Sequence, residues 1–418
     1  MNSGEYKLMG LAPYGEPKYY DLIKEKLIDI KDDGSFRLNM DYFPYCHKTV
    51  MINKKFEQLF GGPARKPESP VTEREMDIAA SIQLVTEEVM LKMANHLHRQ
   101  TGMKNLVLAG GVALNCVGNG RILRESPFEN IWIQPAAGDA GGALGAALFV
   151  WYQLLGNQRT VNGSDLQKGS LLGPAYSNND VKKFLDKINA KYHTIENDEQ
   201  LCDKVAGLID SEKVIGWFQG RTEFGPRALG NRSIIGDARS EKMQSVMNLK
   251  IKFRESFRPF APCVLREDVD GYFEMRPGED SPYMLLVAPV RQDKRIPLDE
   301  SFAKLKGIEK LKTRRSVVPA ITHVDYSARI QTVDPHRHHR LHRLMSRFKE
   351  KTGCPVIINT SFNIRGEPIV CAPEHAYNCF MATDMDVLVL ENQVLYKEEQ
   401  PRTNDSQVLQ YKAKFKLD

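Results

Sequence analysis

The sequence lacks the features of a membrane, secreted or disordered protein. No stretch approaches the ~20 consecutive apolar residues that a membrane-spanning helix needs, and residues 1–7 show no apolar signal-peptide core, so we expect neither a span nor a leader. Only 9% of the residues are aromatic, but 42% are hydrophobic and 27% are charged, a composition that excludes disorder and collagen-like repeats. The length of 418 residues predicts about two or three domains.

Cysteine is scarce, and charge of one sign is not in large excess. The seven cysteines are scattered without a C-x-x-C pair, which favours reduced thiols over a disulfide framework or a zinc site. We therefore expect a cytoplasmic protein. The 58 basic and 53 acidic residues leave a net charge of +5, so the total charge does not require a nucleic-acid partner.

Hydrophobic periodicity predicts an α/β fold with sites at the ends of strands. Residues 72–99 carry the clearest helical pattern and begin with a capping box. Residues 105–111 are typical of a strand that enters a glycine turn, and residues 131–142 repeat that pattern. The small apolar residues of 143–155 predict a helix that is buried.

The composition divides the chain into two domains and a tail. Residues 156–176 are rich in glycine, asparagine and serine, as in a linker. We place the domains at 1–168 and 169–400, followed by a polar, loose tail at 401–418. Further helices are expected at 178–191, 198–211 and 341–352, and further strands at 214–218, 283–290, 316–334, 356–359 and 387–390.

The strongest candidate site is the basic, glycine-rich segment 220–232. Its three arginines alternate with glycines, which let the backbone approach a ligand, and more cations follow at 250–258. Guanidinium groups bind phosphate or carboxylate in a bidentate fork, so several suit a ligand with more than one phosphate. The alternative is a solvated charged face, but the segment lacks helical periodicity and contains Phe224, Pro226 and Leu229. Such residues favour a packed, concave surface and a small anionic ligand, rather than double-stranded nucleic acid.

Two weaker candidates flank this segment. Asn359-Thr-Ser-Phe-Asn363 with Arg365 can orient a nucleotide or a carbonyl group after a strand, although an ordinary polar turn has the same composition. The glycine turns at 110–115 and 138–142 can present backbone N–H groups to phosphate, and Asp139 could bind a metal. Tight packing of helices on a sheet requires the same glycines, so both interpretations stay open.

Two histidine features have competing interpretations. The run His336-Arg-His-His-Arg-Leu-His342 suggests a metal site, but its arginines would repel a cation, which favours an exposed, basic start of a helix. His323 is either a core histidine or a contact to the substrate, and the sequence does not decide between them.

Five motifs, taken together in their order along the chain, carry a family resemblance. They are Met9-Gly-Leu-Ala-Pro-Tyr-Gly15, Gly110-Gly-Val-Ala-Leu-Asn115, Gly138-Asp-Ala-Gly-Gly142, Gly220-Arg-Thr-Glu-Phe-Gly-Pro-Arg-Ala-Leu-Gly230 and Asn359-Thr-Ser-Phe-Asn363. In this order the chain resembles the O-carbamoyltransferases of the nodulation-protein and antibiotic-tailoring type, over roughly residues 5–400.

The resemblance implies a fold and an activity. It implies the C-terminal half of an actin-like (ASKHA, Kae1-like) domain, followed by a YrdC-like α/β domain. The YrdC-like domain would convert carbamoyl phosphate and ATP to carbamoyl adenylate. The actin-like domain, holding a divalent metal (Fe or Mg/Mn), would pass the carbamoyl group to a hydroxyl of a small-molecule acceptor.

The resemblance also assigns residues to roles. The catalytic arginines and lysine would be Arg221, Arg227, Arg232, Lys250 and Arg254, which hold phosphates. Substrate and nucleotide would also contact Glu223, Asn231, Arg258, His323, Arg329, Asn359, Ser361, Asn363, Arg365, Gly110, Gly111, Asn115, Gly138 and Gly141. Asp139 matches the aspartate ligand of the family's metal.

The chain departs from the family's pattern at its start. The family also holds its metal with a His-His-x-x-x-His motif, and no such motif precedes Met9. We therefore expect a truncated chain, or a second chain that supplies the missing half, or a homodimer. The alternative functions are a tRNA threonylcarbamoyladenosine-type modification factor and a non-catalytic, nucleotide-binding regulatory subunit.

Overall fold

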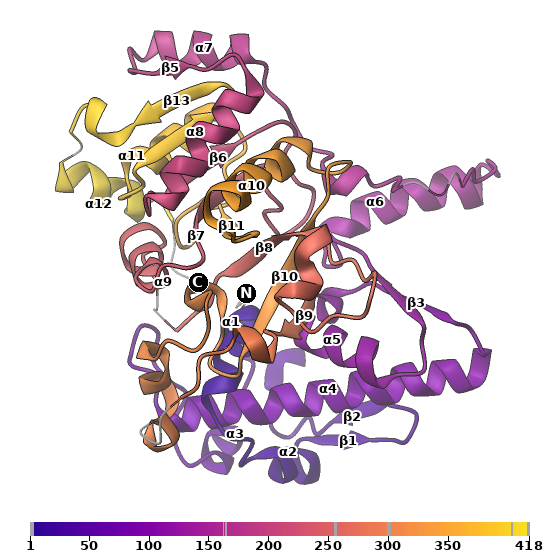
Figure 1. Cartoon of the computed structure of the whole chain (residues 1–418). Helices are drawn as coiled ribbons and strands as arrows, with labels where there is room; N and C mark the ends of the chain where they lie inside the picture. The colour runs from indigo at the N-terminus through magenta and orange to yellow at the C-terminus, as the bar shows by residue number, and fades with distance from the viewer. Residues whose placement is uncertain are drawn as a thin grey trace.

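A nine-stranded mixed sheet forms the centre of the protein in a computed structural model, which describes residues 4–161, 163, 165–254, 257–298, 302–402 and 404–415 (Figure 1). In spatial order the strands are β5 (His193–Thr194), β13 (Gln393–Tyr396), β12 (Val387–Leu390), β6 (Ile215–Phe218), β7 (Arg232–Asp237), β11 (Val356–Ser361), β8 (Ala261–Leu265), β10 (Ser327–Val333) and β9 (Leu286–Pro289). The pairs β6–β12 and β8–β10 are parallel, and the other neighbours are antiparallel.

Helices cover this sheet and close its core. Helices α8 and α10 pack against each other and over β7, β8 and β11, whereas α11 packs on β6 and β12. The strands β6, β7, β8 and β12 are buried along their whole length, as expected of strands with both faces covered. The helices of this part are α7 (Asn178–Lys187), α8 (Asp198–Asp210), α9 (Met243–Val246), α10 (His339–Thr352) and α11 (Pro373–Met381).

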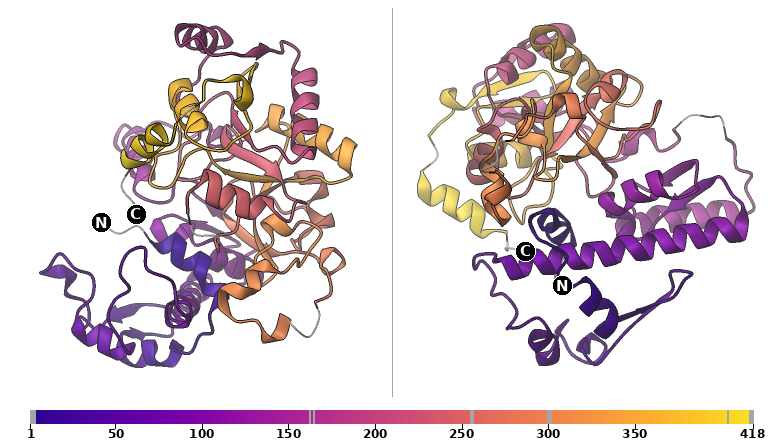
Figure 2. Two further views of the ribbon diagram at one scale, coloured as in Figure 1. Left: turned by 90° about the vertical axis from the view of Figure 1, so that its left-hand side faces the viewer. Right: turned by 60° about the horizontal axis from the view of Figure 1, so that its bottom comes forward.

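The N-terminal elements gather along one long helix, α4 (Glu73–Thr101), below the sheet (Figure 2). Thr72 and Glu75 form the capping box that the sequence predicts, and Gly102 ends the helix in a left-handed conformation (φ 63°). Packed on or near α4 are α1 (Glu5–Leu11), α2 (Tyr20–Lys26), α3 (Lys54–Leu59), α5 (Cys116–Glu125) and the hairpin of β1 (Ile28–Ile30) and β2 (Phe36–Leu38).

A second, two-stranded sheet pairs β3 (Asn105–Leu108) with β4 (Asn130–Ile133) in parallel. Helix α6 (Ala140–Phe149) follows and continues as a π-helix through Val150–Leu154. The prediction that this apolar helix is buried is wrong, because it projects from the body of the protein and none of its residues is buried (Figure 1). Hydropathy alone does not show whether a neighbouring element is present to cover a helix.

The C-terminal segment also differs from the prediction. Instead of a loose tail, the described residues include a helix, α12 (Asp405–Ala413). Its N-terminus is a capping box between Asn404 and Gln407, with hydrogen bonds of 3.0 and 2.9 Å. Elsewhere the predicted mixture of helices and strands is confirmed. Among the described residues, none of the helices is long and apolar enough to cross a membrane.

Candidate functional site

The glycine-rich segment 220–232 forms the loop between β6 and β7, and Glu223 holds it from inside. Oε1 of this buried carboxylate accepts hydrogen bonds from the backbone N–H groups of Leu229 and Asn231 at 2.8 Å. It also accepts one from Arg232 N at 3.2 Å. Three donors on one oxygen fix the path of the loop, so Glu223 supports its shape.

Arg232, the first residue of β7, is buried, and both of its terminal nitrogens donate to backbone carbonyls, whereas its Nε has no hydrogen-bond partner among the described residues. Its Nη1 donates to Gln219 O at 2.7 Å and to Asn231 O, and its Nη2 donates to Gly220 O and Pro174 O. The guanidinium carbon lies 3.5 Å from the centroid of the Phe218 ring. Burial lowers the pKa of Arg232, but its donors still meet acceptors on both ends of the loop.

Arg227 and Arg329 have the opposite surroundings. Nε of Arg227 is buried, and neither guanidinium has a hydrogen-bond or ion-pair partner among the residues that the structure describes. Burial and the nearby positive charge of Arg329 lower the pKa of Arg227 below its ordinary value. Burial also lowers the pKa of Arg329, and the charge of Arg258 adds to the effect. An anion bound between the two arginines would offset the free-energy cost of holding both positive charges away from water.

Several predicted motifs meet around this pair of arginines. The thiol of Cys116, directly after the first glycine turn, is close enough to affect the pKa values of Arg227 and Arg329 and also contacts Met9 Sδ at 3.7 Å. Gly225 lies against Pro135 at the start of the second glycine turn, where a Cβ would come within 3.1 Å of Pro135 O. The loop therefore borders residues from both N-terminal turns.

Asn359 of β11 joins the same region from the sheet. Its Nδ2 donates to Gln331 Oε1 at 2.7 Å and to Ala228 O at 3.4 Å, directly beside Arg227 in the chain. Its buried Oδ1 has no hydrogen-bond partner among the described residues. The hydrogen bonds from Nδ2 thus hold the Asn359 amide in place, while its Oδ1 is available to accept a further hydrogen bond.

The cations after the loop have different environments. Lys250 is exposed, and Arg254 donates from Nε to Asn248 Oδ1 at 2.7 Å and lies 5.0 Å from the centroid of the Phe260 ring. The Arg258 guanidinium lies 4.8 Å from the centroid of the Tyr6 ring on α1. Of these cations, Arg258 is the one whose charge affects Arg329.

Lys252 belongs to the predicted run of cations at 250–258, but the sequence analysis assigned it no role. It is buried, and its Nζ donates to the backbone oxygens of Ser361 and Asn363 and to Asn363 Oδ1, at 2.6–2.8 Å. Burial lowers its pKa well below the ordinary value. The position of Lys252 between the apolar residues Ile251 and Phe253 is a sequence signal for burial. It does not identify Ser361 and Asn363 as the hydrogen-bond partners.

Three other predicted residues connect segments of the chain. Arg365 forms a two-pronged ion pair with Glu68, at 2.9 and 2.6 Å, and so joins the C-terminal part to the N-terminal part. Arg221 is exposed and donates to Gly173 O in the linker at 2.8 Å. Asn231 Nδ2 donates to Arg221 O at 2.8 Å. All three have protein partners already.

His323 is buried and packs against the first motif. Its Nε2 lies 3.2 Å from Gly10 O, its Nδ1 accepts from Val324 N at 2.9 Å, and its ring meets that of Tyr14 edge to face. Burial lowers the pKa of this imidazole. Both ring nitrogens therefore have partners within the protein.

The first glycine turn is braced by its neighbours. Gly110 has a φ of 104°, which favours glycine, and donates to Ala137 O at 2.8 Å; Gly111 follows as the start of a 3₁₀ turn. Asn115 caps α5 by accepting from Gly118 N and exchanges two hydrogen bonds with Gln83 of α4. These bonds hold Cys116 beside the arginines.

The second glycine turn shows tight packing and an exposed acid. A Cβ on Gly141 would come within 2.0 Å of Ala136 O, so only glycine fits there, and Gly141 N donates to Gly138 O. Asp139 is exposed just before α6. Within the described ranges, no three His, Cys, Asp or Glu side chains lie close enough together to hold a metal.

The histidine-rich run forms the start of α10, as predicted, but part of it is not exposed. His338 is buried, which lowers its pKa to about 4. Arg337 pairs with Asp280 at 2.7 Å and Asp334 at 2.6 Å. Asp280 is 57 residues from Arg337, so the sequence pattern did not reveal this pairing.

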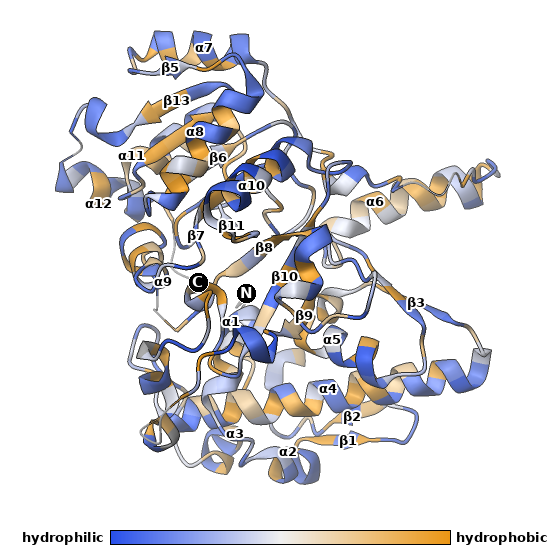
Figure 3. Ribbon diagram, in the orientation of Figure 1, coloured by the Kyte–Doolittle hydropathy of each residue, from blue (hydrophilic) through white to orange (hydrophobic). Residues whose placement is uncertain are grey.

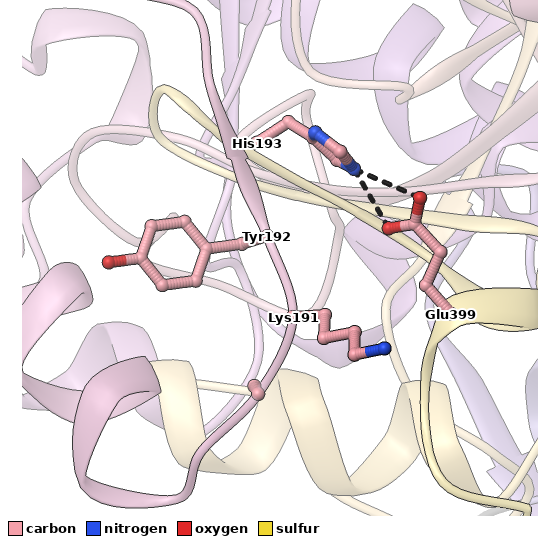
Figure 4. A pocket seen from close by; sticks show the side chains of 5 residues that line it. Lys191, Tyr192, His193 and Glu399 are labelled. Atoms are coloured by element: carbon pink, nitrogen blue, oxygen red, sulfur yellow. Dashed lines mark hydrogen bonds and ion pairs between the residues drawn. The ribbon is translucent and has the colours of Figure 1, made fainter.

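A surface hollow lies elsewhere. It has a volume of about 440 Å³ and is lined by Ala190, Lys191, Tyr192, His193 and Glu399. His193 pairs with Glu399 at 2.8 Å, whereas Tyr192 points away from that pair (Figure 4). This open hollow contains none of the predicted site residues, and its side chains do not converge.

The fold and the loop together define an α/β protein with two partly buried arginines, Arg227 and Arg329, that have no counter-ion within the described ranges. Residues 206–397 match the family described as carbamoyltransferase C-terminus, and residues 1–148 match carbamoyltransferase N-terminus. The chain belongs to the carbamoyltransferase family, as its motifs predict.

Two relatives show how much of a longer protein this chain represents. The uncharacterized protein sll1178 of Synechocystis is 60% identical over 420 residues, which cover all of this chain and 68% of that protein. Nodulation protein NolNO of Sinorhizobium fredii is 36% identical over 395 residues, 94% of this chain and 53% of that protein. A solved structure of full-length HypF, phosphate- and nucleotide-bound, has a TM-score of 0.31 and 16% identity over 51% of this chain and 23% of that chain.

Proposed function

We propose that residues 169–400 form a YrdC-like domain that makes carbamoyl adenylate from carbamoyl phosphate and ATP. Membership of the carbamoyltransferase family supports the carbamoyl group. The observation that carries the proposal is the pair Arg227 and Arg329, two partly buried guanidiniums without a hydrogen-bond or ion-pair partner among the described residues. Such a pair binds a phosphate-bearing ligand favourably because the ligand supplies the missing counter-charge.

The chemistry needs two steps that balance. Carbamoyl phosphate first loses its phosphoryl group to water, which gives carbamate and inorganic phosphate. A carbamate oxygen then attacks the α-phosphorus of ATP, a new oxygen–phosphorus bond forms, and the bond to the bridging oxygen breaks as pyrophosphate leaves. Both steps bring anions together, so positive charge fixed in advance is the main contribution the protein can make.

The residues divide into ligand-binding and supporting roles. Arg227, Arg329 and Arg258 bind phosphate oxygens, and the free Oδ1 of Asn359 accepts a donor from the ligand. Lys252, Ser361 and Asn363 form the neighbouring wall. Glu223 and Arg232 hold the loop in the shape that presents Arg227.

We propose that the carbamoyl group then passes to a hydroxyl of a small-molecule acceptor. The hydroxyl oxygen attacks the carbamoyl carbon, and AMP leaves. Asp139 is the candidate metal ligand of the family pattern, but the described residues bring no further ligands to it, whereas a catalytic metal commonly has about three protein ligands. The donor set therefore does not fit a metal, and the proposed transfer includes no metal-dependent step.

We propose that a further polypeptide covers the apolar face formed by α6, β3 and β4. The face is coloured hydrophobic along much of α6 (Figure 3), and Phe149, Trp151, Val107 and Trp132 are 65%, 53%, 66% and 45% exposed. A parallel pair of strands is not stable as a sheet alone, so the occupant would add strands beside it. The remaining third of sll1178 is the polypeptide to try, by measuring whether it binds in trans and shifts tryptophan fluorescence. A stable homodimer without it would overturn this choice of occupant.

Isotope exchange tests the proposed adenylation. Labelled pyrophosphate should enter ATP only when carbamoyl phosphate is present, because only then does the adenylate step reverse. ATP binding without exchange would favour a regulatory subunit, and exchange that requires bicarbonate and threonine would favour a tRNA-modifying factor. The matched variants are Arg227→Met, which should abolish exchange, and Arg291→Met, an exposed arginine paired with Asp293 that should not affect it.

A further inference from the structure

Helix α12 is docked beside the candidate site although it lies outside the stretch that matches the family. The C-terminal family match ends at residue 397, and α12 spans Asp405–Ala413. None of its residues is buried. An isolated helix of nine residues is marginal in water, so its few contacts with the body must hold it.

The rings of Tyr411 and of Phe415, just after the helix, pack against the main core. Two adjacent side chains, Tyr411 and Lys412, make more specific contacts. The hydroxyl of Tyr411 donates a hydrogen bond to Glu367 Oε1. Lys412 Nζ lies 3.3 Å from the centroid of the Phe253 ring, directly after Lys252 in the chain. Both contacts therefore reach residues close to Lys252 and Asn363, which belong to the proposed wall beside the two arginines.

Glu367 transmits the contact to a tight turn. Its Oε2 accepts from Ile364 N at 2.8 Å, and its backbone oxygen accepts from Asn363 Nδ2 at 2.6 Å. Asn363 in turn accepts from Lys252 Nζ through both its backbone oxygen and Oδ1, at 2.8 and 2.6 Å. A continuous chain of hydrogen bonds thus runs from Tyr411 to Lys252.

We propose that Tyr411 is a positioning residue: α12 is a strap that, through Glu367, keeps the 363–367 turn and Lys252 in the arrangement that receives the ligand. The inference rests on the proposed function for its catalytic consequence. It adds a segment of the chain that the family match leaves out. Tyr411 itself contacts neither substrate nor the arginine pair, and it acts through Glu367.

The test removes one hydroxyl. Tyr411→Phe keeps the ring and loses the hydrogen bond to Glu367, a bond to a charged acceptor whose loss we expect to cost about tenfold in the measured binding. In the full-length chain we expect KM for ATP in pyrophosphate exchange to rise about tenfold, with kcat changed less than about twofold. The matched control is Leu409→Ala, on the same helix and 64% exposed, which should change neither constant.

Amide hydrogen exchange provides a readout that needs no activity. The Ile364 N–H should exchange about tenfold faster in Tyr411→Phe than in the parent or in Leu409→Ala. Unchanged protection of Ile364 would overturn the strap whether or not the enzyme makes carbamoyl adenylate. Faster exchange in a protein that shows no pyrophosphate exchange would support the strap and reject the proposed function. Equal effects on KM and kcat in the presence of faster exchange would overturn the positioning role.

Discussion

Arg232 and Arg227 belong to one loop and have the same side chain, but their surroundings are opposite. Arg232 is buried with carbonyl oxygens of Gln219, Asn231, Gly220 and Pro174 as acceptors. Arg227 faces Arg329 and has no protein acceptor within the described part of the chain. The first guanidinium completes the fold, whereas the second raises the free energy of the empty protein.

Under the proposed function, this difference makes Arg232 a structural cation and Arg227 a ligand-binding one. A buried charge that is fully hydrogen-bonded is destabilising to remove, since its acceptors lose their partner. A buried charge without a partner costs stability until an anion arrives. Stability and ligand affinity should therefore respond in opposite ways when each arginine is replaced.

The largest expected effect is on stability at Arg232. Arg232→Met should lower the free energy of unfolding by about 3–5 kcal/mol, because four carbonyl groups lose their donor in a buried place. Urea denaturation measures this change, with Arg291→Met as the surface control. A loss below about 1 kcal/mol would mean that the four carbonyl partners contribute little to stability, so that Arg232 is not a structural arginine.

The next effect is on affinity at Arg227. Arg227→Met should weaken ATP binding about 100-fold, because a buried guanidinium makes two charge-assisted hydrogen bonds to phosphate. Its free energy of unfolding without ligand should stay the same or rise by about 1 kcal/mol, because an unpaired buried charge disappears. Calorimetric titration and urea denaturation give both numbers. A variant that binds ATP normally but unfolds easily would make Arg227 a second structural arginine.

A smaller effect should follow from pH. Burial and Arg329 lower the pKa of Arg227, whereas a bound phosphate would restore it toward the ordinary value. Because an arginine guanidinium keeps its proton in proteins up to about pH 12, ATP affinity should change less than about twofold from pH 8 to pH 10. The ratio of the affinities of the parent and Arg227→Met should therefore stay the same across this range. A tenfold loss of affinity in the parent over these two pH units would contradict the role of Arg227 as a permanent cation.

Local signals predicted much of the fold. Helix α4 follows from its periodicity and its Thr72–Glu75 capping box, and the glycine turns follow from strands that end in glycine. The burial of α6 was mispredicted because hydropathy shows that a helix is suited to apolar packing. It does not show whether a neighbouring element is present to cover the helix. The docking of α12 depends on Glu367, 44 residues from Tyr411, a separation that periodicity does not cover.

The site was harder to predict because it depends on distant partners. Arg227 and Arg232 are alike in sequence, and they differ because Pro174 and Gln219 supply carbonyl groups to only one of them. Lys250 and Lys252 are also alike, but Lys250 is exposed within the π-helix Met247–Ile251, whereas Lys252 directly after it donates to Asn363. Sequence analysis predicted the segment as a site and could not rank the cations within it.

A crystal structure of the protein with ATP tests the central claim most directly. The account predicts phosphate oxygens within about 3 Å of the guanidinium nitrogens of both Arg227 and Arg329, while Arg232 keeps its carbonyl partners. Phosphates bound instead at the exposed Arg221 and Lys250, with Arg227 and Arg329 still without an anion, would contradict it.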